Sequence, residues 1–194
     1  MFKSRLFLYW FAAQVGGLAL SGLACAKPVE QRVVTYLDSQ AHTSLYPPAA
    51  GFYPNGMIMA QITDRLTWQD PQTLEIKPWI AERWEVSPDK TRYVFYLRPG
   101  VTFSDGSALD ARAVARNYDT FGKGNKALHL PPAEVFSNYD HSEVLTPYSV
   151  AFYFSAPSPG FLQGTSVLGA SLVSAKTLAH RFEELGTGQN IIGS

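Results

Sequence analysis

Hydrophobic and polar residues alternate in short runs through the middle of the chain, and residues that favour turns separate the runs. Alternation with a period of two is typical of half-buried strands, whereas prolines beside small acceptor side chains mark chain reversals. The pattern predicts a helical turn at 79–82 and a hairpin that reverses across 87–91. The strands predicted in this region cover residues 66–68, 74–77, 83–86 and 92–97.

The N-terminal third contains less regular patterning. Residues 32–38 concentrate β-branched and aromatic side chains, which predicts a first strand of a sheet. Residues 39–55 contain many prolines and glycines, so we expect a loop there. Apolar residues at near-helical spacing over 56–66 predict a short helix, with Asn55 as its N-cap.

The second half predicts one amphipathic helix, over 108–121, with Ser107 or Asp110 as its cap. Residues three and four apart share a face of a helix, so one apolar side should face the core. A second hairpin is predicted from 142–145 and 149–155. After it, helices over 157–168 and 174–182 are expected around a strand at 170–173. The core-facing residues of the amphipathic helix are Val114, Tyr118 and Phe121.

The first 26 residues have the order of a secretory signal peptide. Lys3 and Arg5 precede an apolar segment that extends to Ala24, as a charged n-region precedes an apolar h-region. A transmembrane anchor is the competing interpretation, although Gln14 and two glycines interrupt the apolar run. We therefore predict a signal peptide over residues 1–26 and export of the remainder.

Two kinds of processing remain open at the end of this leader. Residues 24–26 read Ala-Cys-Ala and offer an A-x-A cleavage site. Residues 23–25 also approximate a lipoprotein box, in which Cys25 would be acylated, although Gly22 departs from the usual pattern. Because Cys25 is the only cysteine, no intramolecular disulfide can form, and stability must come from the core.

Charge excludes several classes of partner. The sequence has 16 basic and 16 acidic residues, and removal of Lys3 and Arg5 with the leader leaves a net charge of about −2. No run of like charges indicates a basic patch for nucleic acid or an acidic tail. A small neutral or zwitterionic ligand fits this composition better than a charged polymer.

Two segments carry a family resemblance. Residues 78–89 read PWIAERWEVSPD, and residues 97–106 read LRPGVTFSDG. Together they resemble the peptide and nickel class of extracytoplasmic solute-binding proteins, family 5, which deliver ligands to ABC importers. The resemblance implies partners of two kinds, a small-molecule or peptide ligand and the permease subunits of the transporter. It implies contact with the membrane only through the permease or a lipid anchor at Cys25.

The resemblance also implies a fold. We expect an α/β protein like the type II periplasmic binding proteins, but incomplete, with part of the first domain and the smaller β-rich second domain. By this mapping, residues 27–44 and 166–194 belong to the first domain, and residues 45–165 form the small α+β second domain. The end of the chain, 191–194, resembles a family segment that normally continues, so we expect a truncated chain that lacks the C-terminal lobe. Without that lobe, we expect no high-affinity binding and some exposed apolar surface.

Four residues are candidates for contact with the ligand, and all are carried over from the resemblance. Tyr53 and Met57 lie in a segment similar to the cleft-facing loop of nickel-binding relatives. Tyr46 lies where the first loop of the family skirts the cleft, and Ser171 lies where the crossing strand reaches it. Met57 has a second interpretation, as the first core residue of the predicted helix.

Other conspicuous residues have simpler structural interpretations. Trp79 and Trp84 could stack on a ligand, but we predict that they pack the small domain. Phe103, Asp105 and Gly106 are predicted to form a tight turn, with Phe103 in the core, Asp105 as the turn acceptor and a positive φ at Gly106.

Catalytic and cofactor chemistry is not supported by the remaining motifs. The segment 164–169 misses G-x-S-x-G by one residue, and 186–191 lacks the last glycine of G-x-G-x-x-G. We therefore expect no enzyme activity, no catalytic residues, no metal site and no cofactor. A secreted hydrolase and a degenerate or structural fragment without transport function are the rival hypotheses. The four histidines are scattered without metal-binding spacing, at His42, His129, His141 and His180.

Overall fold

The computed structural model describes residues 41–50, 55–186 and 188–194, all of which belong to one compact unit, Asp38–Ser194. The predicted signal peptide, Cys25, the predicted strand at 32–38 and Tyr53 lie outside the described residues.

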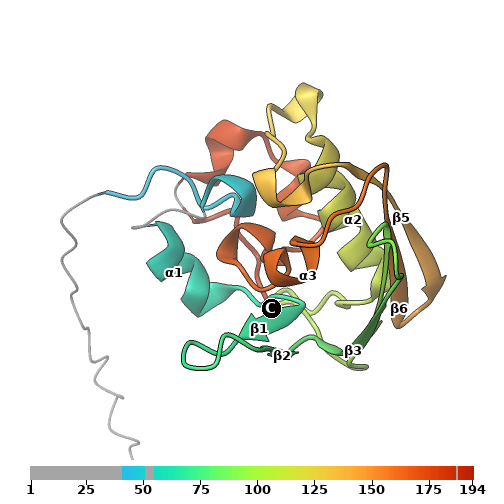
Figure 1. Ribbon diagram of the computed structural model, residues 1–194. Helices are drawn as coiled ribbons and strands as arrows, with labels where there is room; N and C mark the ends of the chain where they lie inside the picture. Colours follow the sequence, from blue (N-terminus) through green and yellow to red (C-terminus); the bar gives the residue numbers. More distant parts are fainter. Residues whose placement is uncertain (1–40, 51–54, 187) are drawn as a thin grey trace, which may run out of the picture. The chain divides into compact units, whose positions relative to one another are not determined.

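A four-stranded antiparallel sheet in the order β3-β4-β6-β5 is the largest regular element of the described part (Figure 1). A separate two-stranded sheet joins β1 to β2. Because neighbouring strands of the large sheet are antiparallel, each hairpin needs only a short connection. The strands are β1 (Thr67–Gln69), β2 (Ile76–Pro78), β3 (Ala81–Val86), β4 (Arg92–Leu97), β5 (Tyr139–Thr146) and β6 (Ser149–Phe154).

Both predicted hairpins are confirmed. Strands β3 and β4 pair in a register that sets Trp84 opposite Phe95, and β5 pairs with β6. The helical turn predicted at 79–82 is wrong, because β3 already begins at Ala81. There the backbone N–H of Ala81 donates to the carbonyl of Leu66 (2.9 Å), which holds the chain extended.

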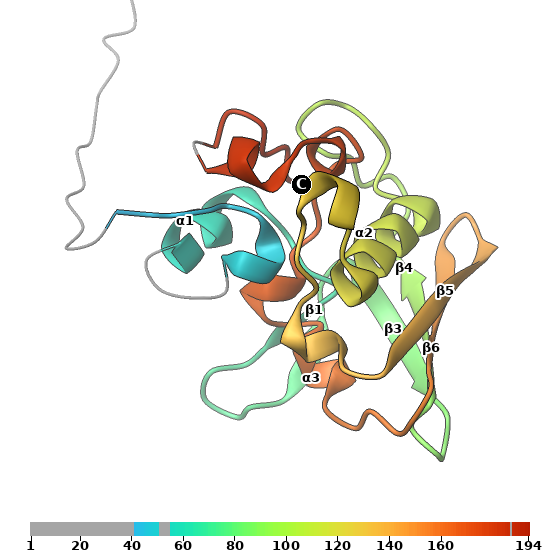
Figure 2. The ribbon, with the colours of Figure 1, turned by 90° about the horizontal axis from the view of Figure 1, so that it is seen from above.

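Helix α2 (Ala111–Lys123) closes one edge of the large sheet. Its N-cap is Asp110, whose side chain accepts a hydrogen bond from the Ala113 N–H at 2.9 Å. On the sheet side, Asp119 accepts hydrogen bonds from the Tyr139 hydroxyl (2.6 Å) and the Ser142 N–H (3.1 Å) of β5. Figure 2 shows α2 beside β5, and through Asp119 the helix satisfies a donor on the outer edge of this strand. The predicted core-facing residues Val114, Tyr118 and Phe121 are all fully buried, which confirms the amphipathic face.

Aromatic side chains fill the space between this helix and the sheet. Phe161 lies among them, with ring centroids 4.6 Å from Phe154, 5.0 Å from Tyr93 and 5.5 Å from Phe152. The contacts with Tyr93 and Phe152 are edge-to-face, and such contacts add to the free energy of burying the rings. The loop from β6 is thereby fixed to the core through the short helix α3 (Phe161–Gly164).

The N-terminal helix differs from the prediction. Helix α1 (Asn55–Ile62) is shorter than expected and includes Asn55 as a helical residue. The Asn55 side chain does not cap it but accepts a hydrogen bond from the Thr43 N–H (2.9 Å) and donates to the Thr43 hydroxyl (3.3 Å). Asn55 therefore ties the preceding loop to the start of the helix.

The C-terminal quarter also differs from the prediction. The expected helices appear as α3 and several single 3₁₀ turns. The strand predicted at 170–173 is wrong, because Ala170 ends the turn η4 and residues 171–173 are irregular. The reason is the hydrogen bonding of the backbone, since the N–H of Leu172 donates to Asp64 and that of Ser174 to Ile192, both in irregular segments. The 3₁₀ turns of the structure are η1 (Pro47–Ala49), η2 (Lys126–Leu128), η3 (Glu134–Phe136), η4 (Leu168–Ala170), η5 (Thr177–Ala179) and η6 (Phe182–Leu185).

Candidate ligand-binding surface

Tyr46 lies inside the molecule rather than on its surface. It precedes η1, and its ring makes edge contacts with Phe121 (5.8 Å) and Phe182 (6.2 Å). Burial raises the pKa of the Tyr46 hydroxyl, which has no hydrogen-bond partner among the described residues. In the described chain Tyr46 therefore acts as a packing residue beneath the surface.

Ser171 is also fully buried, directly after η4. Its hydroxyl likewise has no hydrogen-bond partner among the residues that the structure describes. Turns η1 and η4 pack against each other, and a Cβ added to Gly169 would lie 3.6 Å from the carbonyl oxygen of Pro47. Tyr46 thus lies next to η1 and Ser171 lies next to η4, and these two turns are in contact with each other. The two residues are therefore placed beneath the same part of the surface.

Met57 is the exposed member of the predicted set. Its side chain is 50% exposed on α1, and the neighbouring Ile58 is also exposed. Helix α1 approaches η4 closely, because a Cβ added to Gly56 would lie only 2.9 Å from Cδ1 of Leu168. A glycine at this position lets the two elements meet. The structure therefore brings Tyr46, Met57 and Ser171 to three adjoining elements, with Met57 facing solvent.

Asn117 is a residue that sequence reasoning missed. Its amide is buried in α2 and pairs with both backbone groups of Val173, donating to the carbonyl (2.8 Å) and accepting from the N–H (3.0 Å). These bonds fix the extended segment that carries Ser171. The polar residue in an otherwise apolar helix face, between Val114 and Phe121, was the signal that could have identified it.

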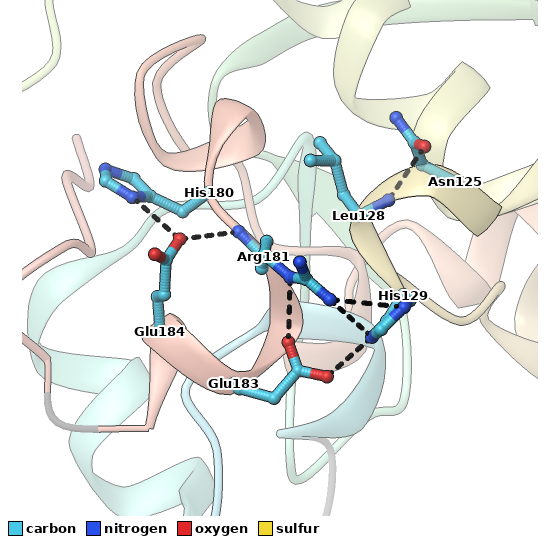
Figure 3. A network of polar contacts seen from close by, with 7 residues as sticks. All are labelled: Asn125, Leu128, His129, His180, Arg181, Glu183 and Glu184. Atoms are coloured by element: carbon cyan, nitrogen blue, oxygen red, sulfur yellow. Dashed lines mark hydrogen bonds and ion pairs between the residues drawn. The ribbon is translucent and has the colours of Figure 1, made fainter.

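A cluster of polar and charged side chains links His129 to Arg181 and Glu183 (Figure 3). It adjoins Phe182, whose ring packs on Tyr46. His129 Nδ1 is 2.6 Å from Glu183 Oε1, and Arg181 Nε is 3.6 Å from the other oxygen of that carboxylate. The hydrogen bond with His129 is the main reason why the pKa of Glu183 is lowered. This cluster joins the end of η2 to η6 at the surface. Most of its side chains are more than half exposed, so its pairs are screened by solvent.

The turn and tryptophan predictions have different outcomes. The turn is confirmed, because Asp105 accepts hydrogen bonds from the N–H and hydroxyl of Ser107, Gly106 has φ +80°, and Phe103 is buried. Trp84 packs partly buried against the core beside Phe95, as predicted. Trp79 was predicted to pack in the interior, but it is 47% exposed and donates its indole N–H to Asp64 (2.6 Å).

Within residues 41–50, 55–186 and 188–194, no three histidine, cysteine, aspartate or glutamate side chains gather where they could hold a metal ion. In the same residues, no helix combines the length and apolar character needed to cross a membrane. The His141 ring stacks on the Tyr153 ring with 4.6 Å between the ring centroids, and His141 Nδ1 is 3.0 Å from Asp140 Oδ2.

Solved structures define the class of the fold. The chain is similar to NikA from Brucella suis in complex with Fe(III)-EDTA, with 28% identity, a TM-score of 0.58, and coverage of 78% of this chain and 30% of that one. It is similar in fold to OppA from Haemophilus influenzae in complex with the peptide RPPGFSPFR, with 20% identity and a TM-score of 0.64. The match covers 79% of this chain and 33% of the OppA chain. The fold is thus that of the type II periplasmic binding proteins, as predicted.

The family follows from the sequence comparisons. The model of the bacterial extracellular solute-binding proteins, family 5 Middle, matches residues 75–194, and the chain belongs to this family. The family consists of substrate-binding proteins of transporters and not of enzymes. Among curated relatives, the glutathione-binding protein GsiB of Salmonella paratyphi A is 29% identical over 113 residues, which cover 58% of this chain. The chain spans only 22% of the length of that relative.

Proposed function

We propose that the chain is part of the substrate-binding component of an ABC importer, which captures a peptide-like or nickel-complex-type solute outside the cytoplasmic membrane. The observation that carries the proposal is the family match over residues 75–194. The permease subunits of that importer would be the partners. We retain the division into a small domain over 45–165 and parts of a first domain at 27–44 and 166–194.

The ligand-binding surface that we propose consists of α1 and the turns η1 and η4 beside it. Met57 would contact the ligand directly, because its flexible, polarisable thioether adapts to ligands of different shape. Tyr46 and Ser171 would support this surface from below, and Tyr53 would lie in the segment that leads into α1. The names of the relatives indicate small zwitterionic or metal-complex ligands, since one binds glutathione and another, NikZ from Campylobacter jejuni, was solved with Ni(L-His).

We expect binding by the 194-residue chain to be weak. A hinged binding protein encloses its ligand between two lobes, which supplies contacts on both sides and excludes water. The surface around Met57 offers contacts from one side. The signal peptide at 1–26 would direct the chain out of the cytoplasm, and Cys25 would carry the lipid if the lipoprotein box is used.

Thermal unfolding tests the proposal, because a ligand that binds the native state raises the unfolding midpoint. The ligands to compare are glutathione, a tetrapeptide and a nickel–histidine complex. At a ligand concentration equal to its Kd, the expected stabilisation is about 0.4 kcal/mol. Replacement of Met57 by alanine should reduce this stabilisation. The matched control is Leu74→Ala, which truncates another exposed apolar side chain, 66% exposed and in the loop between β1 and β2.

The outcomes separate the hypotheses. A midpoint that rises with one ligand class, in the parent protein and in Leu74→Ala but less in Met57→Ala, supports the proposed surface. A rise that is equal in all three proteins would place the binding surface elsewhere. A cooperative transition that none of the ligands moves, even at millimolar concentration, would favour the rival hypothesis of a fragment without transport function.

A further inference from the structure

The two edges of the large sheet are treated differently. At the β5 edge, helix α2 satisfies the outward Ser142 N–H through Asp119, whereas β3 is the terminal strand at the other edge. The Ser87 N–H donates to the Arg92 carbonyl (2.9 Å), and this pair fixes which groups face β4. The backbone N–H and C=O groups of successive residues point alternately to the two sides of an antiparallel strand. The backbone groups of Arg83 and Glu85 therefore face β4, and the backbone groups of Trp84 and Val86 point away from it. Among the described residues, these outward groups have no hydrogen-bond partner.

The charged side chains on this strand do not block every form of pairing. Edge strands are usually protected by charges, and β3 carries Arg83 and Glu85, whose side chains are 60% and 59% exposed. The two charges have opposite signs and lie one residue to either side of Trp84. A two-fold axis at Trp84 would therefore set Arg83 of one chain opposite Glu85 of the other, twice. Like charges would repel in this position, whereas these pairs attract.

We propose that β3 is the interface of a homodimer, in which two copies pair antiparallel about Trp84 and extend the sheet to eight strands. In this register, the outward N–H and C=O of Trp84 bond to Trp84 of the second copy, and Glu82 pairs with Val86. A two-fold interface of this kind is self-complementary, because each chain presents the same strand. The opposite charges on either side of Trp84 favour a second copy of this chain as the partner of β3.

The extent of pairing is limited at the start of the strand. The Ala81 N–H is already bonded to the Leu66 carbonyl (2.9 Å), and the register of β3 against β4 shifts between Ala81 and Arg83, so the pairing cannot extend beyond residues 82–86. Within each chain, Arg83 lies 3.3 Å over the Tyr96 ring and 3.0 Å from Glu85. These contacts hold both charges on the outer face of the sheet, where they would meet their counterparts. A pairing of five residues gives a weak, reversible dimer, with assembly at high protein concentration.

Sedimentation velocity on the full chain tests the proposal over a concentration series that reaches the millimolar range. The parent protein should show a reversible monomer–dimer equilibrium. The variants Arg83→Glu and Glu85→Arg each place like charges opposite each other across the two-fold axis. In each variant alone, the dissociation constant of the dimer should therefore rise about tenfold or more. An equimolar mixture of the two variants pairs opposite charges at both positions and should dimerise again, and so should the double variant.

The mixture is the control for folding, because two variants that had lost their structure could not restore each other. Thermal unfolding of each variant checks this independently. A parent protein that stays monomeric at every concentration would overturn the proposal, and the charges on β3 would then serve only to prevent pairing. Variants that dimerise as well as the parent protein, or a mixture that remains monomeric, would overturn it equally.

Discussion

Replacement of Asn117 by alanine should destabilise the protein strongly. The buried amide makes three hydrogen bonds, two of them to the backbone of Val173 and one to the carbonyl of Ala113 at 2.9 Å. Val173 is itself fully buried, so water cannot replace the lost partner. The variant would leave one N–H and one C=O unpaired in the interior, and each costs about 1–3 kcal/mol. We therefore expect a loss of about 2–6 kcal/mol in the free energy of unfolding.

Urea unfolding monitored by tryptophan fluorescence measures this loss. The matched control is Asn190→Ala, which removes an exposed amide that donates to the carbonyl of Glu184 (3.0 Å) and should cost less than about 1 kcal/mol. If Asn117→Ala and Asn190→Ala cost the same, the segment around Ser171 does not depend on the buried amide, and the reasoning fails.

A second variant at the same position predicts a dependence on pH. Asn117→Asp keeps an acceptor for the Val173 N–H, and only the protonated carboxyl can donate to the Val173 carbonyl. Burial raises the pKa of such a carboxyl in the folded protein above its unfolded value of about 3.9. The folded state of the variant is therefore favoured below about pH 4, and its stability should fall, relative to Asn117, as the pH rises above that value. A difference in unfolding free energy between Asn117→Asp and the parent protein that stays constant with pH would contradict this argument.

Three further changes test the helix cap, the core and the 103–107 turn. Asp110→Ala should cost about 1 kcal/mol in urea unfolding, because the first turn of α2 loses its cap, and an unchanged midpoint would contradict that role. Phe161→Ala should cost about 3–5 kcal/mol, while the exposed Val167→Ala stays within about 0.5 kcal/mol; equal losses would show that the aromatic cluster is not the core. Hydrogen bonds from Ser107 lower the pKa of Asp105 to about 2, so its contribution to stability is present above about pH 4 and is lost as the pH falls toward 2. Asp105→Asn should therefore reduce the loss of stability over that acid range, and an unchanged acid transition would refute the assignment.

Much of the sheet could be predicted because its signals are local. Strand β4 and both hairpins follow from alternation and from prolines at the reversals, and the structure has them in place. The cap at Asp110 and the buried face of α2 follow equally from short-range spacing. In these elements, hydrogen bonding and burial favour the same conformation that the residue types prefer.

The C-terminal quarter could not be predicted in the same way. Apolar runs over 157–182 suggest helices and a strand, but the backbone there bonds to Asp64, Ile192 and the side chain of Asn117. These partners are distant in the sequence, so no local pattern reveals them. Burial of Tyr46 and Ser171 has the same origin, because it depends on the packing of η1 against η4. Trp79 shows the converse case, where a residue expected in the core instead bonds to Asp64 at the surface.

The most direct test of the proposed binding surface uses the methionine methyl groups. The chain has three methionines, and two of them lie on α1 with opposite environments, Met57 exposed and Met59 fully buried. Carbon-13 methyl NMR, with signals assigned through Met57→Leu, reports on both during titration with glutathione or a tetrapeptide. We predict a saturable shift of the Met57 signal while the Met59 signal changes much less. A Met57 signal that stays fixed to millimolar ligand, or that moves no more than Met59, would contradict a ligand-binding surface on α1.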